Sequence, residues 1–316
     1  MPARHTAYGL DLHASFPLLG MRSESRDGLP RLALELLAPA ELEQRFSGAD
    51  GPPEWRGRLG DGRILAIERG IGGDVLFTYG DRARFRLDAS LEHLECAPLC
   101  EGLHWHQALL GRVLPNVAIM RGYEALHASA VDSPEGVVAI AAASGMGKTT
   151  LALELQGRGW PLVADDVLAL GEGPEGVLAH PGTPHMNVAE EPSGAIDPEL
   201  LGDTLGTLAG ERWIAAHATA TGPRPVRLVC LLERGPDLTL EGQILPPNPL
   251  PLAPYMLGLG GDAERERRRF TRYADLMSTT TLMRLTCGNG DRPTQLAEQI
   301  EQTLAEQSLL VAGSAR

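Results

Sequence analysis

Ala142-Ala-Ser-Gly-Met-Gly-Lys-Thr149 is the most informative segment of this 316-residue chain. It follows the unbroken apolar run Gly136–Ala142, which is typical of a strand buried on both faces. A helical apolar pattern follows over residues 149–158. The stretch ends in the Gly-Lys-Thr of the phosphate-binding loop motif G-x-x-x-x-G-K-[ST], although Ala142 stands where the motif has its first glycine. The sequence therefore predicts an α/β fold with a phosphate-binding loop.

The residues of this loop have the chemistry that a nucleotide with Mg²⁺ requires. Gly145 and Gly147 allow successive backbone amides to point inward and surround a phosphate, and the following helix adds its positive N-terminal end. Lys148 would reach the β- and γ-phosphate oxygens, and the Thr149 hydroxyl would bind Mg²⁺ beside them. The predicted nucleotide-binding set is Ser144, Gly145, Met146, Gly147, Lys148, Thr149 and Thr150.

A pair of acids follows the next buried strand. Pro161–Ala164 is predicted as that strand, and Asp165-Asp166 stand at its carboxyl end. Strand, loop, helix and strand make a βαβ unit that brings these acids toward the loop. One acid could bind Mg²⁺, and the other could take the proton from a hydroxyl nucleophile.

Residues 124–168 resemble the catalytic half of HPr kinase/phosphorylase and its HPr-kinase-related relatives. The resemblance rests on His127, on Ser144-Gly-Met-Gly-Lys-Thr149 and on Leu162-Val-Ala-Asp-Asp166, and on the spacing between them. It implies a P-loop catalytic domain with a PEP-carboxykinase-like fold that uses ATP and Mg²⁺.

The resemblance also implies a role for each matching residue. Asp166 would accept the proton of a substrate serine, Asp165 would support it or the metal, and Lys148 would hold the phosphates. Thr149 would bind Mg²⁺ together with Asp165, and His127 would lie beside the reacting group. The implied partner is a protein or peptide that carries the acceptor serine, and ribosomal precursor peptides such as lasso-peptide precursors are among the candidates.

Three alternatives stay open. The chain could be a kinase of small-molecule hydroxyls, an HPr-type regulatory kinase/phosphorylase, or a nucleotide-binding regulator that transfers no phosphate. The Gly-Leu-Gly-Ile signature of true HPr kinases is absent after the acid pair. Glu190 and Glu191 fall where that family has a further metal-binding acid, in different surroundings.

Two domains are expected from the length and from a change of pattern near residue 120. Residues 1–120 are predicted as a smaller β-rich α+β domain, and residues 121–316 as the catalytic domain. Residues 126–131 are predicted as one strand, and the Gly-, Pro- and Glu-rich residues 171–200 as loop.

The net charge of −13 disfavours nucleic acid and anionic membranes as partners. No segment is long and apolar enough to span a membrane, and the four cysteines suit a reducing compartment, so a cytoplasmic location is expected. A homo-oligomer is left open.

Weaker candidates complete the set. An arginine that neutralises transferred charge is sought among Arg212, Arg224 and Arg227, and the basic cluster Arg265–Arg272 could bind an acidic peptide. Each of these is more often a surface feature. A zinc site is a minor alternative for a local group of cysteines and histidines: His93, Cys96, Cys100, His104 and His106.

Overall fold

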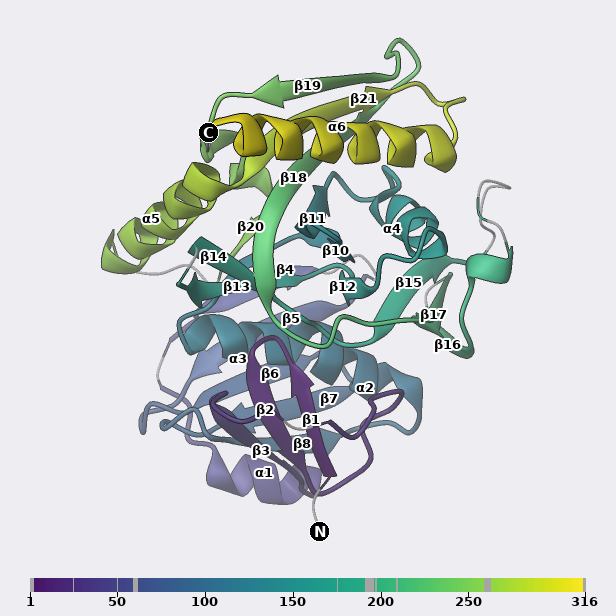
Figure 1. Ribbon diagram of the computed structural model, residues 1–316. Helices are drawn as coiled ribbons and strands as arrows, with labels where there is room; N and C mark the ends of the chain where they lie inside the picture. Colours follow the sequence, from purple (N-terminus) through teal and green to yellow (C-terminus); the bar gives the residue numbers. More distant parts are fainter. Residues whose placement is uncertain are drawn as a thin grey trace. The chain divides into compact units, whose positions relative to one another are not determined.

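The computed structural model describes residues 3–24, 26–49, 51–58, 62–174, 176–190, 196, 198–208, 210–258 and 263–314. The chain forms two compact units, Met1–Tyr123 with Gly258–Gly261 and Glu124–Leu257 with Asp262–Arg316. Each unit has its own sheets and helices (Figure 1).

The first unit is built on an eight-stranded sheet with the order β1-β2-β3-β8-β7-β6-β5-β4. Its first hairpin turns at Tyr8 and Gly9, both with positive φ, and a side chain at Gly9 would collide with the Tyr123 ring. The strands are β1 (Ala3–Ala7), β2 (Leu10–Ala14), β3 (Arg31–Leu36), β4 (Trp55–Arg58), β5 (Ile64–Arg69), β6 (Val75–Tyr79), β7 (Ala83–Leu87) and β8 (His93–Pro98).

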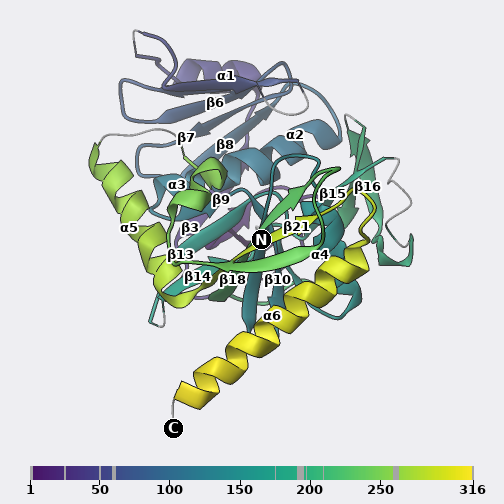
Figure 2. The same cartoon turned by 90° about the horizontal axis from the view of Figure 1, so that it is seen from above.

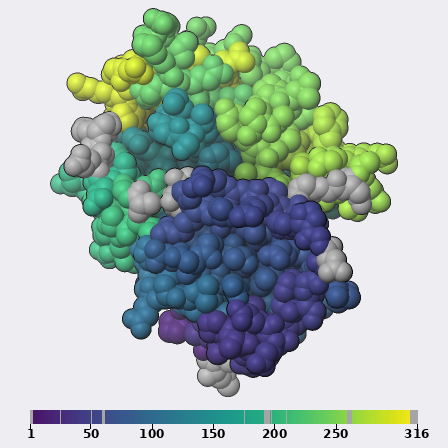
Figure 3. All heavy atoms as spheres, turned by 180° about the vertical axis from the view of Figure 1, so that it is seen from behind, coloured from purple at the N-terminus to yellow at the C-terminus, as the bar shows by residue number. Residues whose placement is uncertain are grey.

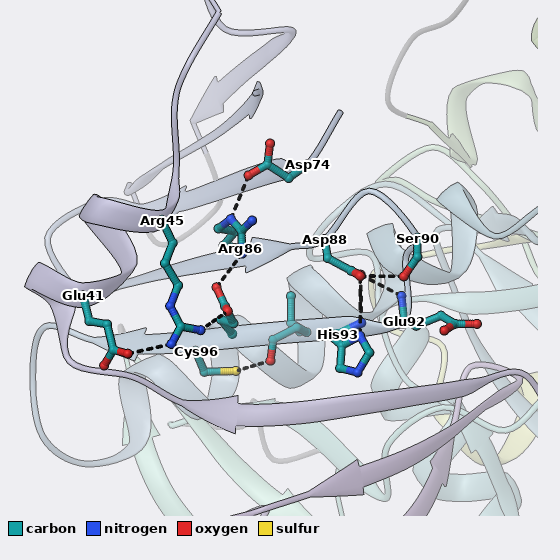
Figure 4. Close-up of polar contacts among 11 residues, drawn as sticks. Glu41, Arg45, Asp74, Arg86, Asp88, Ser90, Glu92, His93 and Cys96 are labelled. Carbon is teal, nitrogen blue, oxygen red and sulfur yellow. Dashed lines mark hydrogen bonds and ion pairs between the residues drawn. The ribbon is translucent and has the colours of Figure 1, made fainter. Parts of the chain in front are cut away.

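Charged side chains of this unit form a connected network beside helix α1 (Pro39–Arg45). Arg86 donates to Asp74 and to Glu95, and Glu95 also accepts from Arg45 (Figure 4). Buried charges are tolerated only when they are paired in this way. The network is therefore explained by its contribution to the stability of the first unit.

Residues 103–120 form one continuous helical stretch with a π-helical turn in its middle. It consists of α2 (Leu103–Ala108), η1 (Leu109–Val113) and α3 (Leu114–Met120). The buried Tyr8 hydroxyl donates to the carbonyl of Leu110 in η1 at 3.0 Å, so the hairpin turn and the π-turn stabilise each other.

The second unit contains a sheet whose central strands are parallel. β11 (Gly136–Ala141), β18 (Arg224–Arg234) and β21 (Thr281–Cys287) lie side by side and parallel. β10 (Ala128–Ser133) is antiparallel to β11 and to β12 (Leu162–Ala164) on its other side. β11 and β12 therefore point the same way with β10 between them, and their carboxyl ends share one sheet edge. β19 (Glu241–Leu245) adds to β21.

The same sheet continues from the first residues of β18 into a second wing. The order there is β18-β14-β13-β9-β20. Between this wing and the parallel strands lies an apolar core that includes Tyr273 and Leu276 of α5. The elements of this side are β9 (Glu124–Leu126), β13 (Leu168–Gly173), β14 (Gly176–His180), η3 (Leu250–Tyr255), β20 (Met256–Leu257) and α5 (Ala263–Thr279).

Helices α4 (Lys148–Gly157) and α6 (Pro293–Ser314) cover the opposite face of the parallel strands. Figure 2 shows that α6 extends beyond the sheet at its C-terminal end, and Figure 3 shows α5, in yellow-green, at the surface. A small sheet of order β15-β17-β16 packs on the same core. Its strands are β15 (His185–Ala189), β16 (Thr204–Leu208) and β17 (Glu211–Ala215), and η2 (Pro198–Leu200) precedes β16.

Several sequence expectations are confirmed and two are wrong. The strand–loop–helix–strand around the phosphate-binding motif is present as predicted. Residues 171–200 are not loop throughout, because β14 and β15 lie within them, and residues 126–131 are two strands that separate at His127. Among the described residues, no helix is both long and apolar enough to cross a membrane.

Candidate functional site

The predicted phosphate-binding residues form a loop between β11 and α4. Gly145 and Gly147 have φ of 79° and 103°, which is left-handed backbone that side chains disfavour. Ser144 and Gly145 are exposed, whereas Met146 is half-buried and packs against the core. Ala142 is fully buried at the end of the strand, so its methyl group takes part in the core.

The first turn of α4 is open to an anion. Gly147 precedes the helix and no described side chain caps this turn, which leaves backbone N–H groups for a ligand. Lys148 is 8% exposed, and its Nζ donates to the Ala142 carbonyl at 3.0 Å. Burial lowers the pKa of Lys148, and the charges of Asp166 and Asp165 oppose that change. Thr149 and Thr150 are half-buried.

The Asp165 carboxylate accepts hydrogen bonds from three elements. Its Oδ1 accepts from the Ser129 hydroxyl at 2.6 Å and from the Thr149 hydroxyl at 2.9 Å. Its Oδ2 accepts from the backbone N–H of Asn187 at 2.9 Å. Burial raises the pKa of Asp165, the neighbouring Asp166 charge acts in the same direction, and the three donors oppose it. Asp165 is thus a partly desolvated acid that three hydrogen bonds fix in place next to the P-loop threonine.

Asp166 occupies a strained turn that faces His127. Its φ is 71°, and the Val167 N–H donates to the Asp165 carbonyl at 2.9 Å across it. That pattern is typical of a γ-turn with a positive central φ, which is rare and strained. The His127 Nδ1 lies 2.9 Å from the Asp166 carbonyl oxygen and 3.2 Å from its Oδ1.

These residues meet because two chain segments cross the sheet together. β9 and β10 are joined at His127, and β12 and β13 are joined through Asp165–Val167. β10 pairs with β12, and β9 pairs with β13, so both segments pass from one wing to the other side by side. The backbone N–H of His127 donates to the Tyr255 carbonyl at 2.7 Å and holds the corner in place. The crossing brings His127 to the acid pair.

Two of the arginine candidates lie away from this site. Arg224 pairs with Asp132, and Arg227 packs over Gly136 at the start of β11. The loop follows the other end of this six-residue strand, about 20 Å away at roughly 3.3 Å per residue. Arg212 of β17 lies opposite Val188 of β15 in the strand register. Val188 directly follows Asn187, so Arg212 is the arginine candidate nearest to the acid pair along the paired strands.

Three arginines of the basic cluster Arg265–Arg272 form ion pairs with glutamates. Arg268, Arg269 and Arg272 of α5 pair with glutamates, Arg269 with Glu124 and Arg272 with Glu172. Glu190 is exposed and follows β15, and Glu191 lies outside the described residues.

The Cys/His group is distributed over different elements. Cys96 is buried in β8, Cys100 follows this strand, and His104 belongs to α2. In the described part of the chain, no three Cys, His, Asp or Glu side chains are arranged to hold a metal ion.

Sequence reasoning missed Ser129 and the backbone N–H of Asn187. Ser129 carried a signal, since it is a single hydroxyl within the apolar run Ala128–Val131. Asn187 could not be found, because its contact depends on its backbone and on the unpredicted strand β15.

Comparisons with known proteins add a remote likeness. No protein-family model and no curated protein matches the chain. Among solved structures it is similar to the Hpr(Ser) kinase/phosphatase from Coxiella burnetii, at 16% identity over 60% of this chain and 98% of that chain. The TM-score is 0.32. A likeness at this score supports no statement about function, so the function is argued from the residues of the site.

Proposed function

We propose that this chain is an ATP- and Mg²⁺-dependent kinase that phosphorylates a serine hydroxyl of a protein or peptide. The observation that carries the proposal is the convergence of an uncapped, glycine-rich helix start with Lys148, Thr149 and the acids Asp165 and Asp166. Phosphoryl transfer requires positioning and charge neutralisation more than covalent chemistry. These groups supply both.

The donor set fits a nucleotide with its metal. Backbone amides at the start of α4 and the Lys148 ammonium suit a polyphosphate. The Thr149 hydroxyl and an Asp165 carboxylate oxygen, 2.9 Å apart, are the hard oxygen donors that Mg²⁺ prefers. When bound, the Mg²⁺ nucleotide would supply the phosphoryl group and neutralise part of its charge.

The protein's own groups would then act on the acceptor. Asp166 would accept the proton of the attacking hydroxyl, because its carboxylate is 27% exposed and can be reached from solvent. His127, 3.2 Å from Asp166 Oδ1, would orient that carboxylate. Lys148 would hold the phosphates, and Asp165 would hold the Thr149 hydroxyl.

The strained turn at Asp166 favours catalysis over simple nucleotide binding. A binding module needs no acid beyond the one at Thr149. A positive φ at a non-glycine residue costs about 1–3 kcal/mol, and such strained residues cluster at active sites. Serine as the acceptor rests on the sequence resemblance of residues 124–168.

The experiment is a transfer assay with γ-labelled ATP. Peptides encoded beside the gene and a panel of hydroxyl metabolites are incubated with the full chain and Mg²⁺, and the products are identified by mass spectrometry. We expect label on a peptide or protein serine. Label on a metabolite would replace the acceptor, and nucleotide binding without transfer to any acceptor would contradict the kinase proposal.

A further inference from the structure

Ser129 is a buried hydroxyl in an apolar strand. It is 0% exposed, and its strand neighbours Ala128 and Ala130 face the core that contains α5. Val131, two residues on, faces the core that contains α4. Because side chains alternate along a strand, Ser129 faces the α4 side as well. Its hydroxyl donates to Asp165 Oδ1 at 2.6 Å.

The Ser129 bond fixes how the Asp165 carboxylate is turned. Ser129 on β10 binds Oδ1, and the Asn187 N–H on β15 binds Oδ2, so two strands hold the carboxylate from opposite oxygens. Oδ1 in this orientation also accepts the single proton of the Thr149 hydroxyl. A hydroxyl whose proton is held in this way keeps its oxygen lone pairs for a cation.

We propose that Ser129 is a positioning residue for Mg²⁺ binding, which acts through Asp165 on the Thr149 hydroxyl. The inference rests on the proposed function. Groups behind a metal ligand commonly change metal affinity by about 10- to 100-fold when they are removed. Ser129→Ala should therefore weaken Mg²⁺ binding, with a larger change in the Mg²⁺ concentration for half-maximal rate than in the rate at saturating Mg²⁺.

The chain provides a matched control. Ser133 lies on the same strand, is 1% exposed, and donates to the Gly136 carbonyl at 2.7 Å. Its hydroxyl contacts Glu135 and Gly136 rather than the acid pair, and Ser133→Ala also removes one buried hydroxyl bond from β10. Ser129→Thr keeps the hydroxyl and should restore affinity.

The test is calorimetric titration of the full-length chain with Mg²⁺ in the presence of a non-hydrolysable ATP analogue. We expect about tenfold weaker Mg²⁺ binding for Ser129→Ala and unchanged binding for Ser133→Ala. Equal Mg²⁺ affinity of the two alanine variants would overturn the inference. Failure of the wild-type chain to bind Mg²⁺ and the analogue would instead contradict the proposed function.

A second measurement uses the protein without metal or nucleotide. Amide hydrogen exchange at Asn187 should be faster in Ser129→Ala than in Ser133→Ala, because its acceptor Asp165 loses one of its two strand anchors. Equal exchange at Asn187 in the two variants, with both folded, would also overturn the inference. This readout holds even if Ser129→Thr fails to fold.

Discussion

Replacement of Asp165 by alanine or by asparagine should have opposite effects on stability. Alanine leaves the Ser129 hydroxyl and the Asn187 N–H without their acceptor. At about 1–3 kcal/mol for each buried unsatisfied donor, Asp165→Ala should lose roughly 2–6 kcal/mol of unfolding free energy. The Thr149 hydroxyl is half-buried and can turn to water, so it adds little.

Asparagine can satisfy the same partners without a charge. Its oxygen can accept from Asn187, and its NH₂ group can donate to the hydroxyls of Ser129 and Thr149, which both accept as well as donate. It also removes a carboxylate whose pKa is raised by burial. An ionised carboxylate whose pKa is raised in the fold opposes folding, so Asp165→Asn should be at least as stable as wild type at pH 8.

The advantage of Asp165→Asn should depend on pH. A carboxyl group whose pKa is higher in the fold than in the unfolded chain destabilises the fold only when it is ionised. The advantage should be absent below the ordinary carboxyl pKa, grow as the pH rises through the raised value, and level off above it.

The assay is urea denaturation of the three proteins from pH 4 to 8. Asp88→Asn in the first unit is the control of opposite sign: burial tends to raise the Asp88 pKa, but bonds from Ser90 and from the amides of His93 and Glu92 outweigh it and lower the pKa (Figure 4). That variant should lose stability at pH 8. Asp165→Asn as unstable as Asp165→Ala would refute the reasoning, because the carboxylate would then be a net stabiliser.

Three further predictions concern other parts of the chain. Lys148→Met should weaken the binding of an ATP analogue at least tenfold, measured by calorimetry. It should cost little stability, because burial already disfavours the Lys148 charge. Unchanged affinity would remove Lys148 from the phosphate site. Gly147→Ala should cost about 1–2 kcal/mol through its φ of 103°, measured by urea denaturation, since no described atom within 4 Å obstructs the new methyl group. Tyr8→Phe should cost about 1–3 kcal/mol by leaving the buried Leu110 carbonyl without its donor; an unchanged midpoint would show that this bond is not needed.

The parts of the fold that the sequence predicted are those with strong local patterns. The apolar run of β11, the glycines before α4 and the acids after β12 can be read from the local sequence, although β11 itself pairs with the distant strand β18. β14 and β15 were missed because their short segments lie among Gly and Pro residues, and they are held by pairing with β13, β18 and β17. Such pairing is set by tertiary context rather than by propensity.

In the candidate site as well, only the residues with a local sequence pattern were predictable. Lys148 and Thr149 come from one motif, and the structure places Thr149 against Asp165 and His127 against Asp166. No local sequence pattern predicts the break between β9 and β10 at His127. The break arises because this segment and the paired β12–β13 segment pass together from one part of the sheet to the other. The chemical roles of these residues stay predictions.

In the proposed reaction, Asp166 accepts the proton during phosphoryl transfer from a nucleotide held by the P-loop. The most direct measurement compares wild type with Asp166→Asn for ATP-analogue affinity and for the single-turnover rate of label transfer from γ-labelled ATP to the acceptor. We predict equal affinity and a rate lower by about 10²- to 10⁴-fold, the usual contribution of a general base. Equal transfer rates, or no binding of the analogue by wild type, would contradict it.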